Sequence, residues 1–393
     1  MKKIYSLVLI FFALTSVAQD YDTLLKTIVA NNPDIAAMEA SIESEVLSIK
    51  SENNLPDTDI DFEHQWGPKE AGNKWSVGIS QGFEWPGVYS ERRKAAQSAT
   101  DAMTFLKRSN YLDKLLEVKL LFIDIVNTRK NIAIMDEVLN HMTQLKEKYH
   151  NGYHQGEVTI LDVNKIDIEH ISVSRRCNEL RTQLTILENS LTALNGGKDC
   201  SAIIATLNDY PQDMILPEDD YVEMIKQNDP MLGYNSFMTK SQASTAKAAK
   251  LKNLPGFSLG YLHVNELGTH FNGFKIGLSL PLFSNRNKVA ASKALLRSLE
   301  NEETSVEVAK LSAMYSDRAK VLTLLKEINE YRPVFEDSNN IALLKKALDG
   351  GEISLLTYLQ EVNYFLSAQR EYMDVVYQYH YSLARLNRYE LLK

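Results

Sequence analysis

The stretch DTDIDFEHQW, residues 57–66, alternates polar side chains with apolar ones. Successive side chains of a β-strand point to opposite faces, so the pattern predicts a strand with one apolar and one polar face. The apolar face carries Ile60, Phe62 and Trp66, and the polar face carries Asp59, Asp61, Glu63 and Gln65. Alternation over about ten residues with an aromatic residue near the end is typical of a lipid-facing barrel strand, although half-buried strands of soluble sheets alternate too.

Three further segments alternate in the same way. Their apolar residues are Trp75, Val77, Ile79 and Phe83, then Phe257, Leu259 and Tyr261, and finally Phe274, Ile276, Leu278, Leu280 and Leu282. The sequence therefore predicts four strands. Four strands cannot close a barrel wide enough to conduct, and an open sheet edge is not tolerated in lipid. Several chains would have to share one barrel.

The strands belong to an internal repeat. Four landmarks return in the same order after 195 to 199 positions: 31–33 (Asn-Asn-Pro) at 228–230 (Asn-Asp-Pro), 53–56 (Asn-Asn-Leu-Pro) at 252–255 (Lys-Asn-Leu-Pro), 77–80 at 276–279, and 156–158 at 351–353. Constant order and spacing predict two copies of one structural plan, residues 19–210 and 217–393. The segment 195–217 is interpreted as the joining loop.

Each copy also contains long stretches of helical pattern. Helices are expected over 34–51 and 231–250, and two much longer ones over 88–149 and 288–349, which could each extend about 90 Å. Helices of this length usually pack as coiled coils. Pro333 lies inside the second long helix and should kink it, whereas the first copy has Val138 at the corresponding position.

The apolar spacing supports coiled-coil packing. One seam contains Ile166, His170, Val173, Cys177, Leu180, Leu184, Leu187, Leu191 and Leu194, and the other contains Leu355, Leu359, Val362, Leu366, Gln369, Met373, Val376, His380 and Leu383. Both alternate steps of three and four, which is the heptad period. We therefore interpret Cys177, His170 and His380 as packing residues and not as chemical groups.

Composition and the chain ends exclude several classes of protein. Residues 1–18 have the positive start, apolar centre and small residues of a secretory signal peptide. The formal net charge of −8 argues against nucleic-acid binding. Two cysteines, Cys177 and Cys200, are too few for a disulfide scaffold, and whether they pair or react stays open. We find no nucleophile elbow, P-loop or metal-ligand cluster, so no catalytic residue, cofactor or metal is predicted.

Taken together, these features resemble the TolC-like outer-membrane efflux factors across essentially the whole mature chain. The resemblance rests on the doubled Asn-x-Pro helix starts, Leu-Pro before the first strand of each copy, Gly-Leu-Ser-Leu-Pro-Leu-Phe at 277–283 and the pattern Gly-Glu-x-x-x-x-Asp-Val at 156–163. The segment 80–89 (SQGFEWPGVY) resembles the metal-efflux branch more than the multidrug branch.

The resemblance implies a mainly α fold with a small β part. Three chains would form a twelve-stranded outer-membrane β-barrel that continues as a periplasmic tunnel of long antiparallel helical hairpins. It implies a homotrimer in the outer membrane of a Gram-negative bacterium, docked to a periplasmic adaptor and an inner-membrane efflux pump, which would usually select the cargo.

The resemblance also assigns roles to residues at the turns between long helices. The adaptor-docking tips would comprise Gly152, Tyr153, Gly156, Glu157, Gly350, Gly351 and Glu352. The plain alternative is a helix–helix turn, for which glycines are suited. His150 and His154 have the spacing of a zinc pair, but Gly152 lies between them and a third ligand is missing.

Two further groups are candidate channel residues. Asp162 matches an acidic position that helps to close the periplasmic aperture in the family, while the second copy carries Thr357 there. Asp162 could instead be an ordinary capping residue. Asp57, Asp59, Asp61 and Glu63 would line the lumen and favour cations, or would simply make the polar wall that any water-filled barrel has.

The sequence thus predicts a passive, non-enzymatic duct. Its main rival is a soluble periplasmic coiled-coil scaffold or adaptor, which would need no lipid-facing band. A surface adhesin and an exported enzyme are weaker alternatives.

Overall fold

The structure is a computed structural model that describes residues 21–68, 72–335 and 340–392. The predicted signal peptide, residues 1–18, lies outside the described residues. Residues 21–31 are helical. The elements that follow are α2 (Pro33–Ser51), β1 (Thr58–Trp66), β2 (Asn73–Phe83), α3 (Pro86–His154), α4 (Ile160–Leu194), α5 (Ser201–Thr206), α6 (Glu218–Asn228), α7 (Pro230–Leu251), β3 (Gly256–Glu266), β4 (Thr269–Ser279), α8 (Lys288–Phe335), α9 (Asn340–Asp349), α10 (Leu355–Leu386) and the 3-10 helix η1 (Arg388–Leu392).

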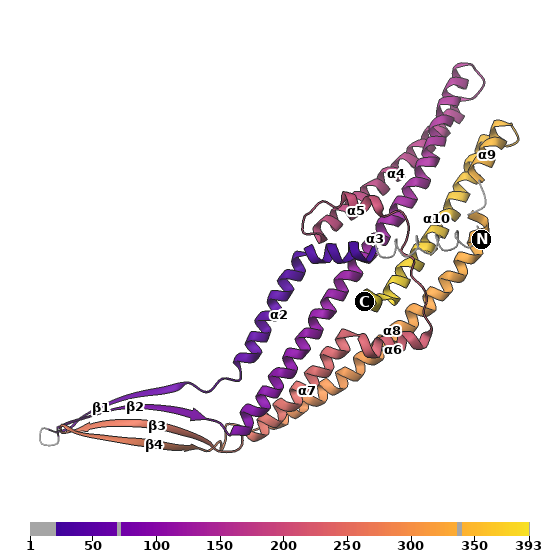
Figure 1. Cartoon of the computed structure of the whole chain (residues 1–393). Coiled ribbons are helices and arrows are strands. Elements are labelled where there is room, and N and C mark those ends of the chain that lie inside the picture. Colours follow the sequence, from indigo (N-terminus) through magenta and orange to yellow (C-terminus); the bar gives the residue numbers. More distant parts are fainter. Residues whose placement is uncertain (1–20, 69–71, 336–339, 393) are drawn as a thin grey trace, which may run out of the picture. The chain divides into compact units, whose positions relative to one another are not determined.

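The chain forms two compact units, and each takes segments from both halves of the sequence (Figure 1). The first unit comprises Met1–Ala36, Asn110–Met224 and Leu311–Lys393, and the second comprises Ala37–Ser109 and Ile225–Lys310. The two sequence copies are therefore interleaved within each unit.

The first unit is built around the predicted heptad seams. One core cluster contains Met135, Val138, Met142, Leu145, Ile166, Val173, Cys177, Ile341, Leu355, Tyr358, Leu359, Val362 and Leu366. These residues come from α3, α4, α9 and α10, so the two helical hairpins bury their seams against each other. Burial of a large apolar side chain contributes about 1.5–3 kcal/mol, which makes this cluster a main stabilising feature of the unit.

Pro333 lies inside α8, close to its last described residue, and the first copy has Val138 at the corresponding position. Residues 86–154 form the single helix α3, while the second copy is described as α8 up to Phe335 and α9 from Asn340. Residues 336–339 lie outside the described residues, so the single long helix expected over 288–349 stays a prediction. Proline lacks an N–H and its ring crowds the carbonyl four residues earlier, so we expect Pro333 to kink α8. The segment 195–217 was expected to be a loop, but it contains the short helix α5.

Helices of the second unit approach closely because small residues line their contacts. Ala95, Ala99 and Ala102 of α3 are buried. The Ser241 hydroxyl of α7 donates to the carbonyl of Ala95 over 2.9 Å. Gln242 Nε2 donates to the carbonyl of Ser292 on α8, also over 2.9 Å. These bonds fix α7 between α3 and α8.

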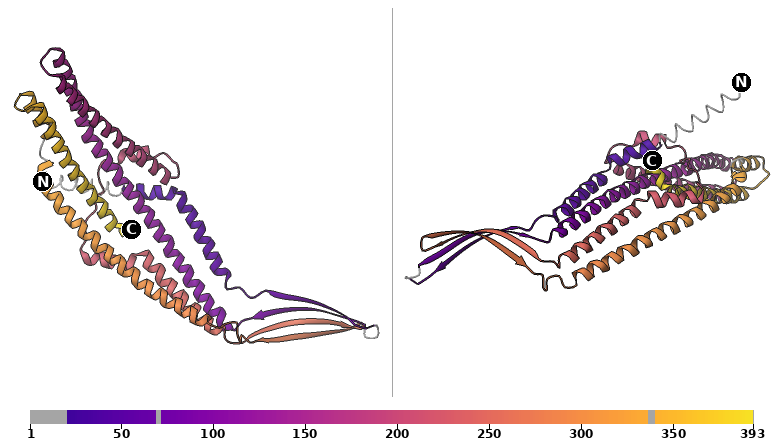
Figure 2. Two further views of the ribbon diagram at one scale, coloured as in Figure 1. Left: turned by 180° about the vertical axis from the view of Figure 1, so that it is seen from behind. Right: turned by 60° about the horizontal axis from the view of Figure 1, so that its bottom comes forward.

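The second unit ends in an antiparallel sheet with the strand order β1-β2-β3-β4 (Figures 1 and 2). Its register aligns the predicted apolar residues in rows, for example Ile60 beside Ile79, Tyr261 and Phe274. Two details differ from expectation. Leu280 and Leu282 follow the last residue of β4, and β3 continues to Glu266, which places Leu262 and Val264 on the face predicted to be polar.

His380 of α10 packs in the first unit as a neutral aromatic ring. It stacks on Tyr210 with the ring centroids 4.3 Å apart and the planes 10° from parallel. Burial lowers the pKa of His380 to about 4, although Asp213 acts in the opposite direction. The packing role predicted for this seam position agrees with that environment.

We expect His380 to make the protein less stable in mild acid. The unfolded chain binds a proton at His380 below about pH 6.5 while the native state does not, so stability falls from pH 6.5 to about 4 by up to about 3 kcal/mol. His380→Phe should therefore lose less thermal stability than the natural chain between pH 7 and pH 4.5, as followed by circular dichroism. His154→Asn, at an exposed position, is the control. If His380→Phe lost as much thermal stability between pH 7 and pH 4.5 as the natural chain does, the prediction would be contradicted.

Candidate functional site

The turn between α3 and α4 is a helix C-cap built on glycine. The amide of Glu157 donates to the carbonyl of Gly152 over 2.9 Å, and the amide of Gly156 donates to that of Tyr153 over 3.1 Å. This pair of bonds defines a Schellman motif, whose capping residue must adopt the left-handed conformation. Gly156 does so with φ +75°. Gly152 and Tyr153 belong to the last turn of α3.

The turn between α9 and α10 has the same construction. The amide of Glu352 donates to the carbonyl of Ala347 over 2.9 Å, and that of Gly351 donates to Leu348 over 3.1 Å. Gly351 has φ +72°. The two predicted tips therefore have the same hydrogen bonds and the same left-handed glycine. Gly350 directly precedes the capping residue Gly351.

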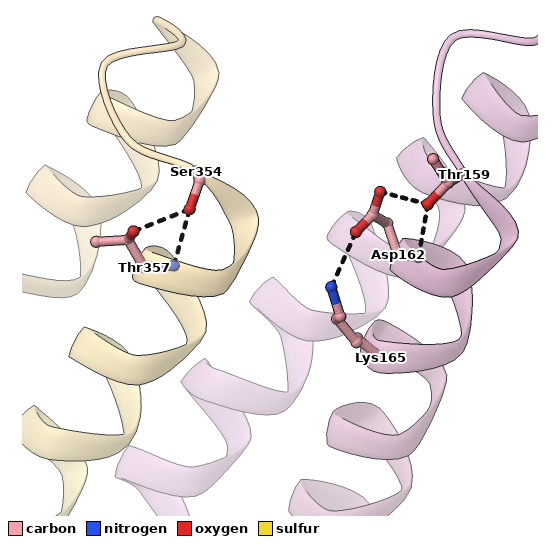
Figure 3. A network of polar contacts seen from close by, with 5 residues as sticks. All are labelled: Thr159, Asp162, Lys165, Ser354 and Thr357. Atoms are coloured by element: carbon pink, nitrogen blue, oxygen red, sulfur yellow. Dashed lines mark hydrogen bonds and ion pairs between the residues drawn. The ribbon is translucent and has the colours of Figure 1, made fainter.

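Each tip leads directly into a capped helix start (Figure 3). The hydroxyl of Thr159 accepts from the amide of Asp162 over 3.2 Å and donates to a carboxylate oxygen of Asp162 over 2.7 Å. The hydroxyl of Ser354 accepts from the amide of Thr357 over 3.1 Å. An N-cap hydroxyl satisfies one of the free amides of the first turn and contributes about 1 kcal/mol.

Asp162 is held as a carboxylate by local contacts. The Thr159 hydroxyl and the ammonium group of Lys165 hold the pKa of Asp162 below its usual range. The Lys165 Nζ lies 3.2 Å from a carboxylate oxygen of Asp162. In the second copy Thr357 carries no charge, and its hydroxyl lies 2.9 Å from that of Ser354.

The structure brings the two tips close together within the first unit. Lys148 near the end of α3 forms an ion pair of 2.7 Å with Asp349 at the end of α9. Lys345 donates to the side-chain oxygen of Gln144 over 2.8 Å. Views from two sides show both turns at the same end of their hairpins (Figures 1 and 2). Tyr153, Glu157 and Glu352 are exposed there.

His150 and His154 have separate contacts. His150 Nε2 lies 3.1 Å from a carboxylate oxygen of Asp167, which lowers the pKa of Asp167. The ring of His154 lies beside that of Tyr153. Within residues 21–68, 72–335 and 340–392, no group of three or more histidine, cysteine or acidic side chains is arranged to hold a metal ion.

Three of the four acidic candidates of the lumen lie on one face of β1. Asp59, Asp61 and Glu63 alternate along the strand and are exposed, while Asp57 precedes its first residue. The register places Lys275 of β4 in the same row as Asp59. Lys74 of the same face forms an ion pair of 3.2 Å with Glu266. The face is thus acidic along β1 and mixed in charge towards its other strands.

Both cysteines are free and buried. Burial raises the pKa of each thiol, which favours the unreactive protonated form. The Cys177 thiol donates to the carbonyl of Met135 over 3.4 Å across the α3–α4 contact. Cys177 and Cys200 therefore do not form a disulfide in this structure, and the environment of Cys177 agrees with its predicted packing role.

No helix in the part of the chain that the structure describes is long and apolar enough to cross a membrane.

Comparison with known proteins shows a likeness of fold to solved structures. No protein-family model matches the chain, and no curated protein matches it in sequence. Solved structures do match: the outer-membrane channel OprN has a TM-score of 0.78 at 10% identity, with 94% of this chain and 89% of OprN covered. A membrane protein from Pseudomonas aeruginosa has a TM-score of 0.77 at 16% identity, with 94% and 92% covered. The CmeC outer membrane channel of Campylobacter jejuni has a TM-score of 0.74 at 16% identity, with 94% and 85% covered.

These matches define the fold. The chain has the TolC-like fold of outer-membrane channels over nearly its whole length, as the sequence resemblance implied. Helical hairpins combined with a four-stranded sheet form the shared architecture.

Sequence reasoning missed the hydroxyl caps at the tips. Thr159 and Ser354 each precede their capped partner by three residues, which is the spacing of a capping box. The motif Thr-x-x-Asp at 159–162 could therefore have predicted the start of a helix at Thr159. The motif also indicates that Asp162 is the hydrogen-bond partner of the N-cap residue Thr159.

Replacing either capping glycine, Gly156 or Gly351, by another residue should destabilise its turn. A left-handed conformation costs an L-residue about 1–2 kcal/mol, and nothing lies within 4 Å of an added Cβ at Gly156 or Gly351, so the cost is conformational. Gly156→Ala and Gly351→Ala should speed amide hydrogen exchange at their own tip by about five- to thirtyfold, as measured by mass spectrometry. Gly152→Ala, within the helix, should have a much smaller effect; equal protection in all three variants would contradict the prediction.

Proposed function

We propose that this chain is the outer-membrane channel subunit of a tripartite efflux system in a Gram-negative bacterium. Three copies would form a passive duct, and an inner-membrane pump would drive transport through a periplasmic adaptor. The observation that carries the proposal is a sheet with one exposed apolar face and two unpaired edges. The likeness of fold to outer-membrane channels supports it.

The apolar face of the sheet is exposed in the single chain. Phe274 is 85% exposed, Ile276 81%, Ile60 73% and Phe62 70%. Large contiguous apolar patches are rare on soluble monomers and indicate contact with a protein or with lipid. The rows run across all four strands, so the patch has the form of a band. Lipid is the partner that suits a band of this kind.

The sheet edges favour sharing between chains. β1 and β4 each have a neighbour on one side only, which leaves a row of backbone donors and acceptors without partners. Unpaired edges are unstable in lipid and prone to aggregation in water. Pairing β4 of one copy with β1 of the next would satisfy both edges. Three copies would close a barrel of twelve strands.

The first unit carries apolar residues outside its core that would pack between copies. Ile160, Leu161, Ile168, Ile171 and Ile186 on α4, together with Leu343 on α9 and Leu356 and Tyr364 on α10, are exposed. Burying them against neighbouring helices would continue the coiled-coil packing of the core. This arrangement would assemble a helical tunnel from three pairs of hairpins.

The paired tips are the proposed docking end. Both present a backbone turn fixed by glycine and one exposed glutamate, Glu157 or Glu352. A docked adaptor would contact both, because the hairpins are tied together by the Lys148–Asp349 ion pair. For the aperture we retain Asp162 and Thr357 as candidates, with a small role for charge because Lys165 offsets the carboxylate.

Membrane recovery and size test the proposal directly. The mature chain should fractionate with outer membranes, migrate in mild detergent at three times its chain mass and conduct ions in planar bilayers. Phe274→Arg, on the apolar face, should prevent membrane assembly, since a cation at the bilayer midplane costs about 2–4 kcal/mol per chain.

The matched control is Lys275→Glu, on the next residue of the same strand and the opposite face. It should assemble normally. Recovery of the natural chain as a soluble monomer would overturn the proposal and favour a periplasmic scaffold or adaptor.

The acidic face of β1 should make the pore prefer cations. Three copies would carry Asp59, Asp61 and Glu63 around the lumen, and a ring of acidic side chains favours cation entry. The triple variant Asp59→Asn, Asp61→Asn, Glu63→Gln should lower the ratio of potassium to chloride permeability, as obtained from reversal potentials in a salt gradient. Glu157→Gln, at the tip, is the control. An unchanged ratio in the triple variant would show that these residues form only a polar wall.

A further inference from the structure

Two histidines meet at the end of the β3–β4 hairpin. His263 of β3 pairs in register with Asn272 of β4, and His270 of β4 pairs with Asn265 of β3. The two imidazoles are therefore diagonal neighbours on one face of the sheet. They follow the apolar rows and lie next to the turn at Leu267.

The ring nitrogens have the separation of two metal ligands. His263 Nε2 lies 3.3 Å from His270 Nδ1. Two imidazole nitrogens that bind a tetrahedral ion at about 2.0–2.1 Å lie about 3.3–3.4 Å apart. The centroids of the rings are 5.4 Å apart with the planes at 27°, so neither ring covers the other's nitrogen.

A hydrogen-bond network fixes the tautomer of His263. The Asn272 side-chain oxygen accepts from the Tyr261 hydroxyl over 2.7 Å and lies 2.8 Å from His263 Nδ1. Because that oxygen can only accept, His263 Nδ1 carries the hydrogen and Nε2 presents its lone pair towards His270. Histidine ligands of metal ions characteristically donate their other N–H to an oxygen in this way.

Asn265 constrains the second ring. Its side-chain oxygen accepts from the amide of Gly268 over 3.2 Å, which directs its NH₂ group towards His270. Because an NH₂ group only donates, His270 Nδ1 presents its lone pair and the ring carries its hydrogen on Nε2. His263 Nε2 and His270 Nδ1 would then both offer lone pairs to a metal ion, which would displace the Asn265 contact without a change of tautomer.

We propose that His263 and His270 form a binding site for one divalent transition-metal ion, with water completing its coordination. Two neutral imidazoles without a carboxylate favour copper, nickel or zinc over calcium or magnesium. The site involves neither the tips nor the acidic face of β1, and it goes beyond the proposed duct function because it would bind the ion whether or not the chain conducts.

Cu²⁺ is the probe that tests the site in the purified full chain in detergent. We expect one Cu²⁺ per chain, with an electron paramagnetic resonance spectrum showing two coordinated imidazole nitrogens. Trp75 provides a second signal, because its ring lies 5.4 Å from that of His263 and bound Cu²⁺ should quench its fluorescence. His263→Gln and His270→Gln should each weaken binding by about tenfold or more.

The controls separate this pair from the other histidines. His64→Gln changes a histidine on the same face, packed against Trp66, and should leave Cu²⁺ affinity unchanged. The double variant His150→Gln, His154→Gln should also bind normally. Unchanged affinity in both His263→Gln and His270→Gln, a comparable loss in His64→Gln, or a spectrum with a single imidazole nitrogen would overturn the proposal.

Asn272 tests the tautomer argument as a positioning residue. Asn272→Ala removes the oxygen that holds the hydrogen on His263 Nδ1, so Cu²⁺ should bind about tenfold more weakly while the two-nitrogen spectrum is retained. Affinity equal to that of the natural chain would show that the Asn272 contact does not orient the ligand.

Discussion

The helices α3, α4, α9 and α10 depend for their stability on one shared apolar seam. A helix of 69 residues such as α3 gains little from intrinsic propensity, since most helical stability in proteins comes from packing of an apolar face. In the first unit that face is buried by residues from both halves of the chain, with Val138 and Val362 among the most enclosed. The capped turns hold the hairpins in the register that this seam requires. The position of the tips, and therefore the proposed docking end, follows from the packing.

Much of this architecture could be predicted from periodicity. The steps of three and four through Val173 and Cys177, and the alternation through Ile60 and Phe62, each reflect a geometric period of the backbone. Such patterns survive without any detectable family match, because many different apolar residues satisfy them. This explains how solved structures at 10–16% identity can share the fold over 94% of the chain.

The remaining features depend on local competition that periodicity does not express. The continuation of β3 to Glu266 is decided by pairing with β4, and the segment's mixed polarity gave no sign of it. The approach of His263 to His270 required knowledge of the register, because a shift of one residue would place the rings on opposite faces. The tips were found from glycines, while their hydroxyl caps were overlooked.

The interleaving of the two compact units has a consequence for synthesis. The first unit joins residues of the first half of the chain to its last long helix, as in the bond of 2.8 Å between the Tyr377 hydroxyl and Asp124. Contacts that span so much sequence form slowly, because loop closure must precede them. The first half of the chain therefore cannot reach its final structure while the second is still being made. During that interval α3 and α4 expose the part of their seam that α9 and α10 later cover, and exposed apolar surface of this kind promotes aggregation.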